Sequence, residues 1–231
     1  MSSCSPLRWW PACPGVSVKR RQVLQAFVLA SLMATPGLAI AQALDQFLKA
    51  VEQGDAKTVA ALLNRGLDPD TADPVGNTVL MIASRLGHQD LVALLLDRKA
   101  GVLRRSPHGD TALMFASLKG HLGIARLLVQ SGALVGHDGW APLHYAAFEG
   151  RSEVLKFLID KGADKNALAP NGYSSLMLAA YGGHLEAVRT LLYEDADVRL
   201  RGPKGETALG IAATRKDLEL EGLLRRAGAV D

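Results

Sequence analysis

Three histidines recur at equivalent points of the chain, a pattern that could bind a metal or a haem. His88, His121 and His184 each directly follow a glycine, so a regular fold would stack them along one edge. Imidazole nitrogen is the commonest metal ligand in proteins. The alternative is that repetition of the sequence explains the spacing, with each ring hydrogen-bonding near the start of the next helix. We favour this alternative and expect no metal site.

A second row of side chains has donors that could bind copper. Met81, Met114, His144 and Met177 occupy equivalent positions in successive stretches of sequence. Thioether and imidazole groups both suit copper. Methionine also fills irregular gaps between packed helices, however, and the row needs no further explanation than that. We therefore expect packing at this row and no cofactor.

Catalytic motifs are absent from the sequence. It has no phosphate-binding loop, no dinucleotide glycine fingerprint, no Gly-x-Ser-x-Gly and no His-Glu-x-x-His. Both cysteines, Cys4 and Cys13, lie near the N-terminus, so the rest of the chain has no thiolate for a metal site or a disulfide. We predict that the protein is not an enzyme, and an enzyme or a metal- or haem-binding protein remains a remote alternative.

The elements that position these side chains follow from one repeated phrase. It reads Gly-x-Thr-x-Leu-Met-x-Ala at Gly76 and Gly109, and it returns in modified form at Gly139, Gly172 and Gly205. The interval is 33 residues except between Gly109 and Gly139, where it is 30. A fixed period of this size is typical of a stacked solenoid, in which each unit packs only on its neighbours.

Each unit contains the signals for two helices. The residue two places after the turn glycine has a hydroxyl that can cap the first helix, at Thr78, Thr111, Ser174 and Thr207. The fourth unit has Ala141 there, followed by Pro142, which suits the first position of a helix. Most second helices end at a glycine; Lys99 and Asp195 depart from this rule in two units, and a left-handed conformation at Lys99 would cost roughly 1–2 kcal/mol.

The repeated phrase resembles the ankyrin family, whose pattern is Gly-x-Thr-Pro-Leu-His-x-Ala-Ala-x-x-Gly-His with a later Leu-Leu and Gly-Ala-Asp. The resemblance covers about residues 44–229. It implies an all-α solenoid of about six helix-turn-helix repeats with short hairpin loops. The expected segments are a leader over 1–41, a degenerate capping repeat over 42–75, repeats over 76–108, 109–138, 139–171 and 172–204, and a C-terminal capping repeat over 205–231.

The first 41 residues have the order of a secretory signal. Lys19, Arg20 and Arg21 precede an apolar stretch over 23–33, and small residues at Ala39 and Ala41 offer a cleavage site. The run 19–25 resembles the twin-arginine export signal, although Val23 replaces its usual Phe, so the general secretory route stays open. A membrane anchor is the alternative. We expect cleavage, a bacterial periplasmic or secreted protein, and no membrane contact afterwards.

The net charge excludes one class of partner. The formal charge is +3, but residues 1–41 contain four basic residues and no acidic residue. The remainder has 22 basic residues against 23 acidic ones. No basic stripe is left to follow a phosphate backbone, so we do not expect nucleic acid as a partner.

The resemblance also predicts where a partner would bind. In ankyrin proteins the hairpin tips and the first helices form the concave binding face. On this chain the corresponding residues are Asn77, Arg85, His108, Asp110, Lys119, Trp140, Phe148, Glu149, Asn171, Tyr173, Tyr181 and Lys204. Four large aromatic residues among them, Trp140, Phe148, Tyr173 and Tyr181, fall in repeats 4 and 5, and Trp and Tyr are enriched at interface hot spots. The alternative is that some of these rings pack against neighbouring hairpins.

The 30-residue interval predicts a local irregularity. Three residues are missing from the arm at 133–138, between the third and fourth repeats. We expect a stunted arm and a notch beside Trp140, which shapes the recognition surface unless the deletion is simply a tolerated loop change.

Together these features predict an exported, monomeric module that binds a protein partner of unknown identity through its concave face. One specific version is support of an exported enzyme in stress defence, suggested by resemblance to bacterial periplasmic ankyrin proteins. A secreted effector or inhibitor of a target protein is the alternative. A repeat scaffold does not identify its own ligand.

Overall fold

The computed structural model describes residues 36–136 and 139–230 of the chain. Contacts divide the chain into two compact units, Met1–Ala43 and Leu44–Asp231. The leader predicted over 1–41 lies outside the described residues except for its last part, which belongs to helix α2 (Pro36–Gln53). This helix continues without a break across the predicted boundary between residues 41 and 42.

The described residues form twelve helices and no extended strand, which confirms the all-α class. After α2 they are α3 (Ala56–Asn64), α4 (Val79–Leu86), α5 (Gln89–Asp97), α6 (Ala112–Lys119), α7 (Leu122–Gln130), α8 (Pro142–Phe148), α9 (Ser152–Asp160), α10 (Ser175–Gly182), α11 (Leu185–Tyr193), α12 (Ala208–Arg215) and α13 (Leu218–Arg226). Isolated bridges pair Ala72 with Thr78 and Leu168 with Ser174, at the base of two hairpin loops. Within the described ranges, no helix has both the length and the apolar character needed to cross a membrane.

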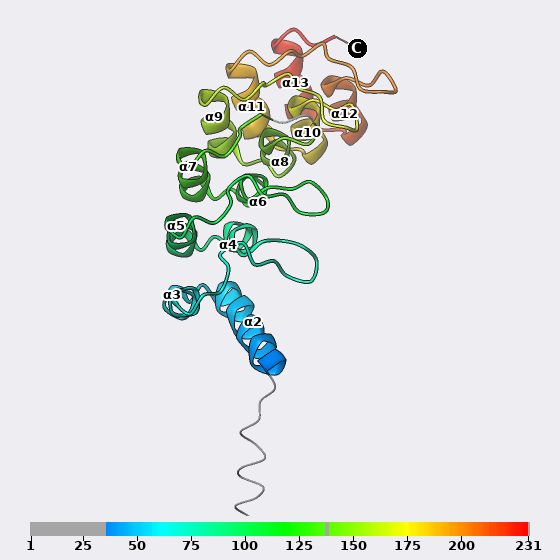
Figure 1. The fold of residues 1–231 in the computed structure, drawn as a ribbon. Coiled ribbons are helices and arrows are strands. Elements are labelled where there is room, and N and C mark those ends of the chain that lie inside the picture. The colour runs from blue at the N-terminus through cyan, green and yellow to red at the C-terminus, as the bar shows by residue number, and fades with distance from the viewer. Residues whose placement is uncertain (1–35, 137–138, 231) are drawn as a thin grey trace, which may run out of the picture. The chain divides into compact units, whose positions relative to one another are not determined.

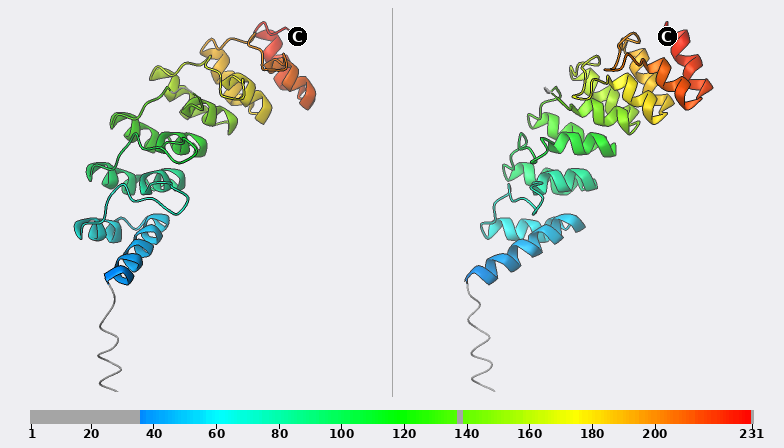
Figure 2. Two further views of the ribbon diagram at one scale, coloured as in Figure 1. Left: turned by 45° about the vertical axis from the view of Figure 1, so that its right-hand side comes forward. Right: turned by 90° about the vertical axis from the view of Figure 1, so that its right-hand side faces the viewer.

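Within the unit Leu44–Asp231 the helices form two rows. The first helices of the repeats, α4, α6, α8, α10 and α12, pack on one another in order, and the second helices form a parallel row from α3 to α13 (Figure 1). The two further views show the same succession of helix pairs (Figure 2). Apolar residues from both rows make one continuous core, which includes Leu80, Leu113, Leu143, Leu176 and Leu209 at equivalent positions. Each repeat thus buries its apolar surface only by stacking on its neighbours.

The first helices begin as the sequence predicts. The hydroxyl of Thr78 accepts a hydrogen bond from the Met81 amide at 3.3 Å, and Thr111, Ser174 and Thr207 cap their helices in the same way. In repeat 4, Ala141 has no such group and Pro142 starts the helix. There the ring of His144 accepts the Ala141 amide at 3.0 Å through Nδ1, so one end group is satisfied from a different side chain.

Three helix ends adopt the left-handed conformation without a glycine. Lys99 (φ 66°) and Asp195 (φ 56°), the two departures from glycine noted in the sequence, both do so. Lys216 (φ 59°) is a third case that the sequence analysis did not single out, at the end of α12, where α4, α6 and α10 have a glycine. A side chain in this conformation costs about 1–2 kcal/mol, so these three positions depart from the repeat at the expense of stability.

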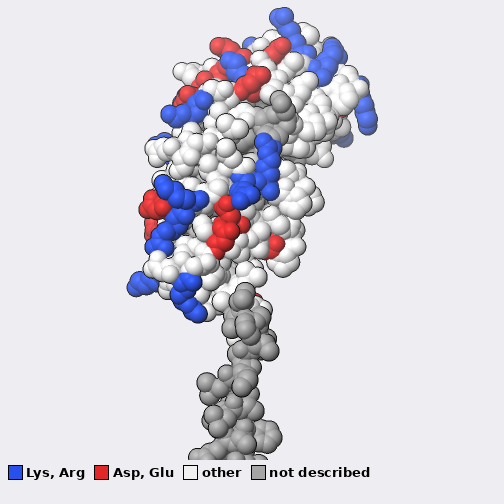
Figure 3. Space-filling view, viewed as in Figure 1, with Lys and Arg blue, Asp and Glu red and all other residues white. Residues whose placement is uncertain are grey.

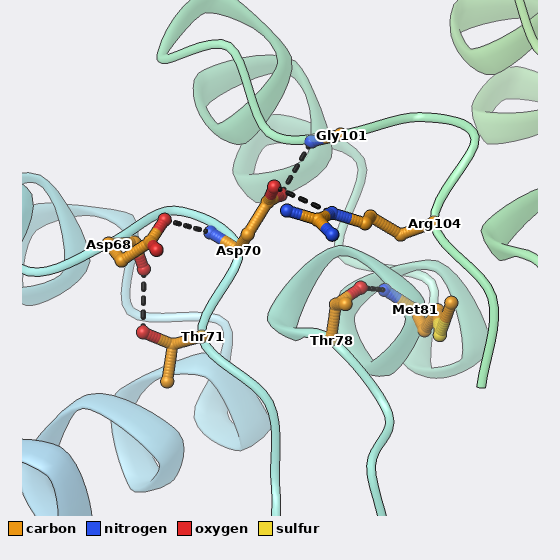
Figure 4. A network of polar contacts seen from close by, with 7 residues as sticks. All are labelled: Asp68, Asp70, Thr71, Thr78, Met81, Gly101 and Arg104. Atoms are coloured by element: carbon orange, nitrogen blue, oxygen red, sulfur yellow. Dashed lines mark hydrogen bonds and ion pairs between the residues drawn. The ribbon is translucent and has the colours of Figure 1, made fainter. Parts of the chain in front are cut away.

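A carboxylate joins the arm of the first repeat to that of the second. Asp70 accepts hydrogen bonds from the Gly101 amide at 2.6 Å and from Arg104 Nε at 3.0 Å. Figure 4 shows this network together with the Thr78 cap. Asn166 plays the same part later in the chain, where it accepts the Asp197 amide at 2.9 Å. The two intervening repeats have Leu103 and Gly136 at this position, neither of which can accept such a bond from its side chain.

Candidate functional site

Two of the three recurring histidines, His88 and His184, connect their repeat to the one before it. His88 Nε2 donates to the Glu52 carbonyl at 3.0 Å, and His184 Nε2 donates to the Phe148 carbonyl at 2.9 Å. Arg151 stands in the histidine position of repeat 4, and its Nε donates to the equivalent carbonyl of Leu118 at 3.2 Å. An arginine can replace the imidazole because the position requires a hydrogen-bond donor. This contact between repeats accounts for His88 and His184 without a metal.

The Met and His row faces the core. The side chains of Met81, Met114, His144 and Met177 are all buried. Both ring nitrogens of His144 are occupied, because Nδ1 accepts from Ala141 while Nε2–H donates to the Ala167 carbonyl at 3.0 Å. Burial lowers the pKa of His144, which keeps the ring neutral in this arrangement. Within 36–136 and 139–230, no cluster of three His, Cys, Asp or Glu residues could hold a metal.

The four aromatic residues of repeats 4 and 5 line one hollow of about 460 Å³ on the first-helix side. We call Trp140, Phe148, Tyr173 and Tyr181 the aromatic groove. The other lining residues are Asn171, Leu178, Pro203, Lys204 and Glu206. Hairpin tips supply Trp140 and Tyr173, and the last turns of α8 and α10 supply Phe148 and Tyr181.

Trp140 is held in place by the residues beneath it. Its ring lies edge-on to His144 with centroids 6.0 Å apart and is tilted against Tyr145 at 5.8 Å. Tyr145 in turn donates from its hydroxyl to Asp110 Oδ1 at 2.5 Å. Burial, followed by this hydrogen bond, raises the pKa of Tyr145. The indole is half-buried, so one part of it packs on the core and another lines the hollow.

Tyr173 is fixed by a carboxylate from the next hairpin. Its hydroxyl donates to Glu206 Oε1 at 2.5 Å, and the Lys204 amide donates to Glu206 Oε2 at 2.8 Å. The hydrogen bond from Tyr173 holds the pKa of Glu206 below its usual value, and the same bond raises the pKa of Tyr173. The ring of Tyr173 is thereby oriented before any partner arrives.

Phe148 and Tyr181 are the exposed members of the groove. They occupy the same register in α8 and α10, and their exposed fractions are 42% and 56%. The equivalent residues in the other repeats are Arg85, Leu118 and Thr214. Only repeats 4 and 5 therefore present an aromatic ring here, which gives two adjacent exposed rings and an apolar area for contact.

A second hollow of about 490 Å³ lies beside the first and extends the site into the last repeat. The two hollows share Tyr173, Tyr181, Lys204 and Glu206. Gly205, Gly210, Ile211, Thr214 and Arg215 complete the second one. Leu178 of the first hollow and Ile211 of the second were not among the predicted binding residues. Both lie at the same place after the turn glycine of their repeat as Phe115 and Tyr145 do. This shared position on the first helix is the sequence signal that could have identified them.

Family comparison identifies this architecture. The model described as "Ankyrin repeats (3 copies)" matches residues 47–138, 103–169 and 143–229. The chain belongs to the ankyrin-repeat family. The crystal structure of the human ASB11 ankyrin repeat domain is similar, with a TM-score of 0.75 and 25% sequence identity over 80% of this chain and 84% of that one. No curated protein sequence matches the chain. Ankyrin repeats are generally non-catalytic modules that bind other proteins.

The other predicted binding residues of the ankyrin face lie outside both hollows. Three of them are engaged within the chain: Asn77 Nδ2 donates to Asp73 at 3.3 Å, Asp110 accepts from Tyr145, and Glu149 pairs with Arg151 at 3.4 Å. Arg85 stands over the Phe115 ring at 5.9 Å, while His108 and Lys119 are exposed. The structure thus gathers Trp140, Phe148, Asn171, Tyr173, Tyr181 and Lys204 at the first hollow and leaves the other six apart.

The shortened ankyrin arm over 133–138 is described only in part. Of this arm, His137 and Asp138 lie outside the described residues. A hollow of only about 30 Å³ is found beside Ala133 and Leu134, and Trp140 is not part of it. The Trp140 ring instead packs on His144 and Tyr145, within its own repeat. The notch beside Trp140 stays a prediction, because the end of this arm lies outside the described residues.

Proposed function

We propose that this ankyrin protein is exported and binds a protein partner through the aromatic groove and its two hollows. The observation that carries the proposal is the convergence of Trp140, Phe148, Tyr173 and Tyr181 on one surface of two neighbouring repeats. Large aromatic side chains supply most of the binding free energy at many protein interfaces.

The preorganised state of the groove supports this role. Trp140 is held by its contacts with His144 and Tyr145, and Tyr173 is held by Glu206. Side chains that are already ordered lose less conformational entropy when a partner binds. Phe148 and Tyr181 remain exposed and would lose the most water-accessible surface on binding.

The sequence of the leader supports export. Three consecutive basic residues, an apolar stretch and a small-residue cleavage site occur in the order of a secretory signal. N-terminal sequencing of protein from fractionated cells tests this part directly. A mature N-terminus near residue 42 or 44 in an extracytoplasmic fraction is the expected result, and an uncleaved cytoplasmic chain would contradict it.

Affinity capture tests the binding role. The chain serves as bait beside the variant Trp140→Ala/Tyr173→Ala, and Arg126→Ala on the outer helix α7 is the control. For a partner whose binding saturates, we expect the double variant to lose about 2 kcal/mol or more of binding free energy, because these rings are hot-spot candidates. The control should bind like the parent chain. Equal capture by the parent and the double variant would contradict the aromatic groove as the binding surface.

A further inference from the structure

The two hollows are placed so that two side chains of one extended segment can each occupy one of them. They lie on either side of a shared wall, Tyr173 and Tyr181, and belong to consecutive repeats. Their volumes of about 460 and 490 Å³ fall within the range of about 300–1,000 Å³ that is common for ligand pockets. Leu178 backs the first hollow and Ile211 backs the second, so each has an apolar floor.

Basic residues end three of the five first helices along this face, and α8 and α10 have none in their last turns. Arg85, Lys119 and Arg215 lie in the last turns of α4, α6 and α12, and Lys216 follows α12. Acidic residues instead begin the second helices, at Asp90, Glu153, Glu186, Glu219 and Glu221. Charge of both signs is interspersed on the face turned to the viewer in Figure 3. The basic character is thus local to the ends of α4, α6 and α12 and is not a property of the whole molecule.

The cations at the hollows are not neutralised by carboxylates within hydrogen-bond reach of their charged groups. Arg215 Nη1 donates to the carbonyl of Tyr181 at 2.7 Å, which leaves its positive charge uncompensated. Lys204 lines both hollows, and its ammonium forms no ion pair with the described part of the chain. Glu206, the acid of this site, already accepts hydrogen bonds from Tyr173 and from the Lys204 amide. A partner with negative charge would complement this surface.

We infer that the partner presents an extended acidic segment, with two large apolar side chains in the hollows and carboxylates facing Lys204 and Arg215. This inference rests on the proposed function and specifies the chemistry of its partner. The apolar side chains supply contact area against the four rings, and the carboxylates supply orientation and electrostatic attraction.

Selection from a random twelve-residue peptide library displayed on phage tests the inference on the full chain. We expect the enriched peptides to combine acidic residues with a pair of aromatic or large aliphatic residues. Enriched peptides that lack acidic residues would overturn the inference. So would a selection in which nothing is enriched above the Trp140→Ala/Tyr181→Ala variant, since that would exclude an extended segment as the occupant.

Charge variants of the chain then test the electrostatic contribution with one synthetic peptide from the selection. Binding by fluorescence anisotropy should weaken about ten-fold in Lys204→Gln/Arg215→Gln and fall further as salt rises. Lys204→Glu, which removes no side-chain hydrogen bond, should weaken binding at least as much as Lys204→Gln and without loss of thermal stability. The matched change Arg126→Gln/Lys161→Gln on the outer helix row should alter binding less than two-fold by the same reasoning.

The outcomes separate this inference from the proposed function. Binding that survives Trp140→Ala/Tyr181→Ala would show that the groove is not the site, so both proposals would fail. Binding lost in that variant but unchanged in the charge variants would overturn only the acidic partner. Equally tight binding of a single-stranded DNA with the peptide's net charge would also overturn it, because the surface would then select charge alone.

Discussion

Repeats 2 and 4 share a backbone plan but present different surfaces. At matching positions, repeat 2 has Asn77, Ile82 and Arg85 where repeat 4 has Trp140, Tyr145 and Phe148. The Asn77 side chain is bonded to Asp73 within its own hairpin, whereas Trp140 lines an open hollow. The buried leucines of the two repeats, Leu80 and Leu143, are equivalent. The comparison teaches that the core positions determine the fold, and that the inner-face positions can change without altering it.

The largest expected effect tests the equivalence of the cores. Leu80→Ala and Leu143→Ala should each lower the free energy of unfolding by about 3 kcal/mol, because both side chains are 1% exposed and packed in the same row. Urea denaturation followed by circular dichroism measures this loss. A difference of more than about 1.5 kcal/mol between the two variants would show that the two repeats are not equivalent scaffolds.

A second pair of variants tests the difference between the surfaces. Tyr181→Ala should weaken binding of the captured partner by about 2 kcal/mol, as expected for an exposed aromatic hot spot. Leu118→Ala, at the same register in repeat 3, should change it by less than about 0.5 kcal/mol. Titration of each variant with labelled partner gives both values. Equal losses at the two positions would place the interface along the whole face and remove the contrast between repeats.

Acid should affect repeat 4 more than the methionine-containing repeats. The folded pKa of His144 lies below its unfolded value, chiefly through burial, with opposition from the Ala167 carbonyl and Asp164. The unfolded chain therefore takes up the proton first, so stability is complete above about pH 6.5 and falls as the pH drops toward the folded pKa. The slope from this residue is at most about 1.4 kcal/mol per pH unit.

The variant His144→Met, which restores the residue found at Met81, Met114 and Met177, should remove that part of the pH dependence. Unfolding free energies of both proteins between pH 7 and pH 5 provide the measurement. Parallel curves for the parent and the variant would mean that His144 does not lose stabilising contacts on protonation.

The smallest effect concerns the helix starts. Thr78→Ala should destabilise repeat 2 by about 1 kcal/mol, since it removes the hydroxyl that accepts the Met81 amide. Ala141→Thr should stabilise repeat 4 by less than about 1 kcal/mol, because the His144 amide already donates to the Ala141 carbonyl at 3.0 Å and a hydroxyl would only share it. Thermal melts of both variants measure the shifts. Destabilisation by Ala141→Thr would indicate that the Trp140–His144 packing leaves no room for the hydroxyl.

Much of the fold could be predicted from single positions because their physics is local. The hydroxyl caps and the left-handed ends at Lys99 and Asp195 follow from neighbouring residues alone. Lys216 was missed although its place in the repeat normally has a glycine, which is the same signal that identified Lys99 and Asp195. The tie between Asp110 and Tyr145 was missed because the two residues are 35 positions apart and come from different repeats.

The sequence by itself determined that the chain is an ankyrin solenoid and which rings could reach its inner face. A repeat of fixed period specifies every core position at once, because each unit has the same neighbours. The tertiary structure decided which of the candidate residues meet. Stacking joined Tyr173 to Glu206, joined Asp110 to Tyr145, and opened a second hollow over Ile211. These outcomes depend on distances between side chains of different repeats, which the period does not encode.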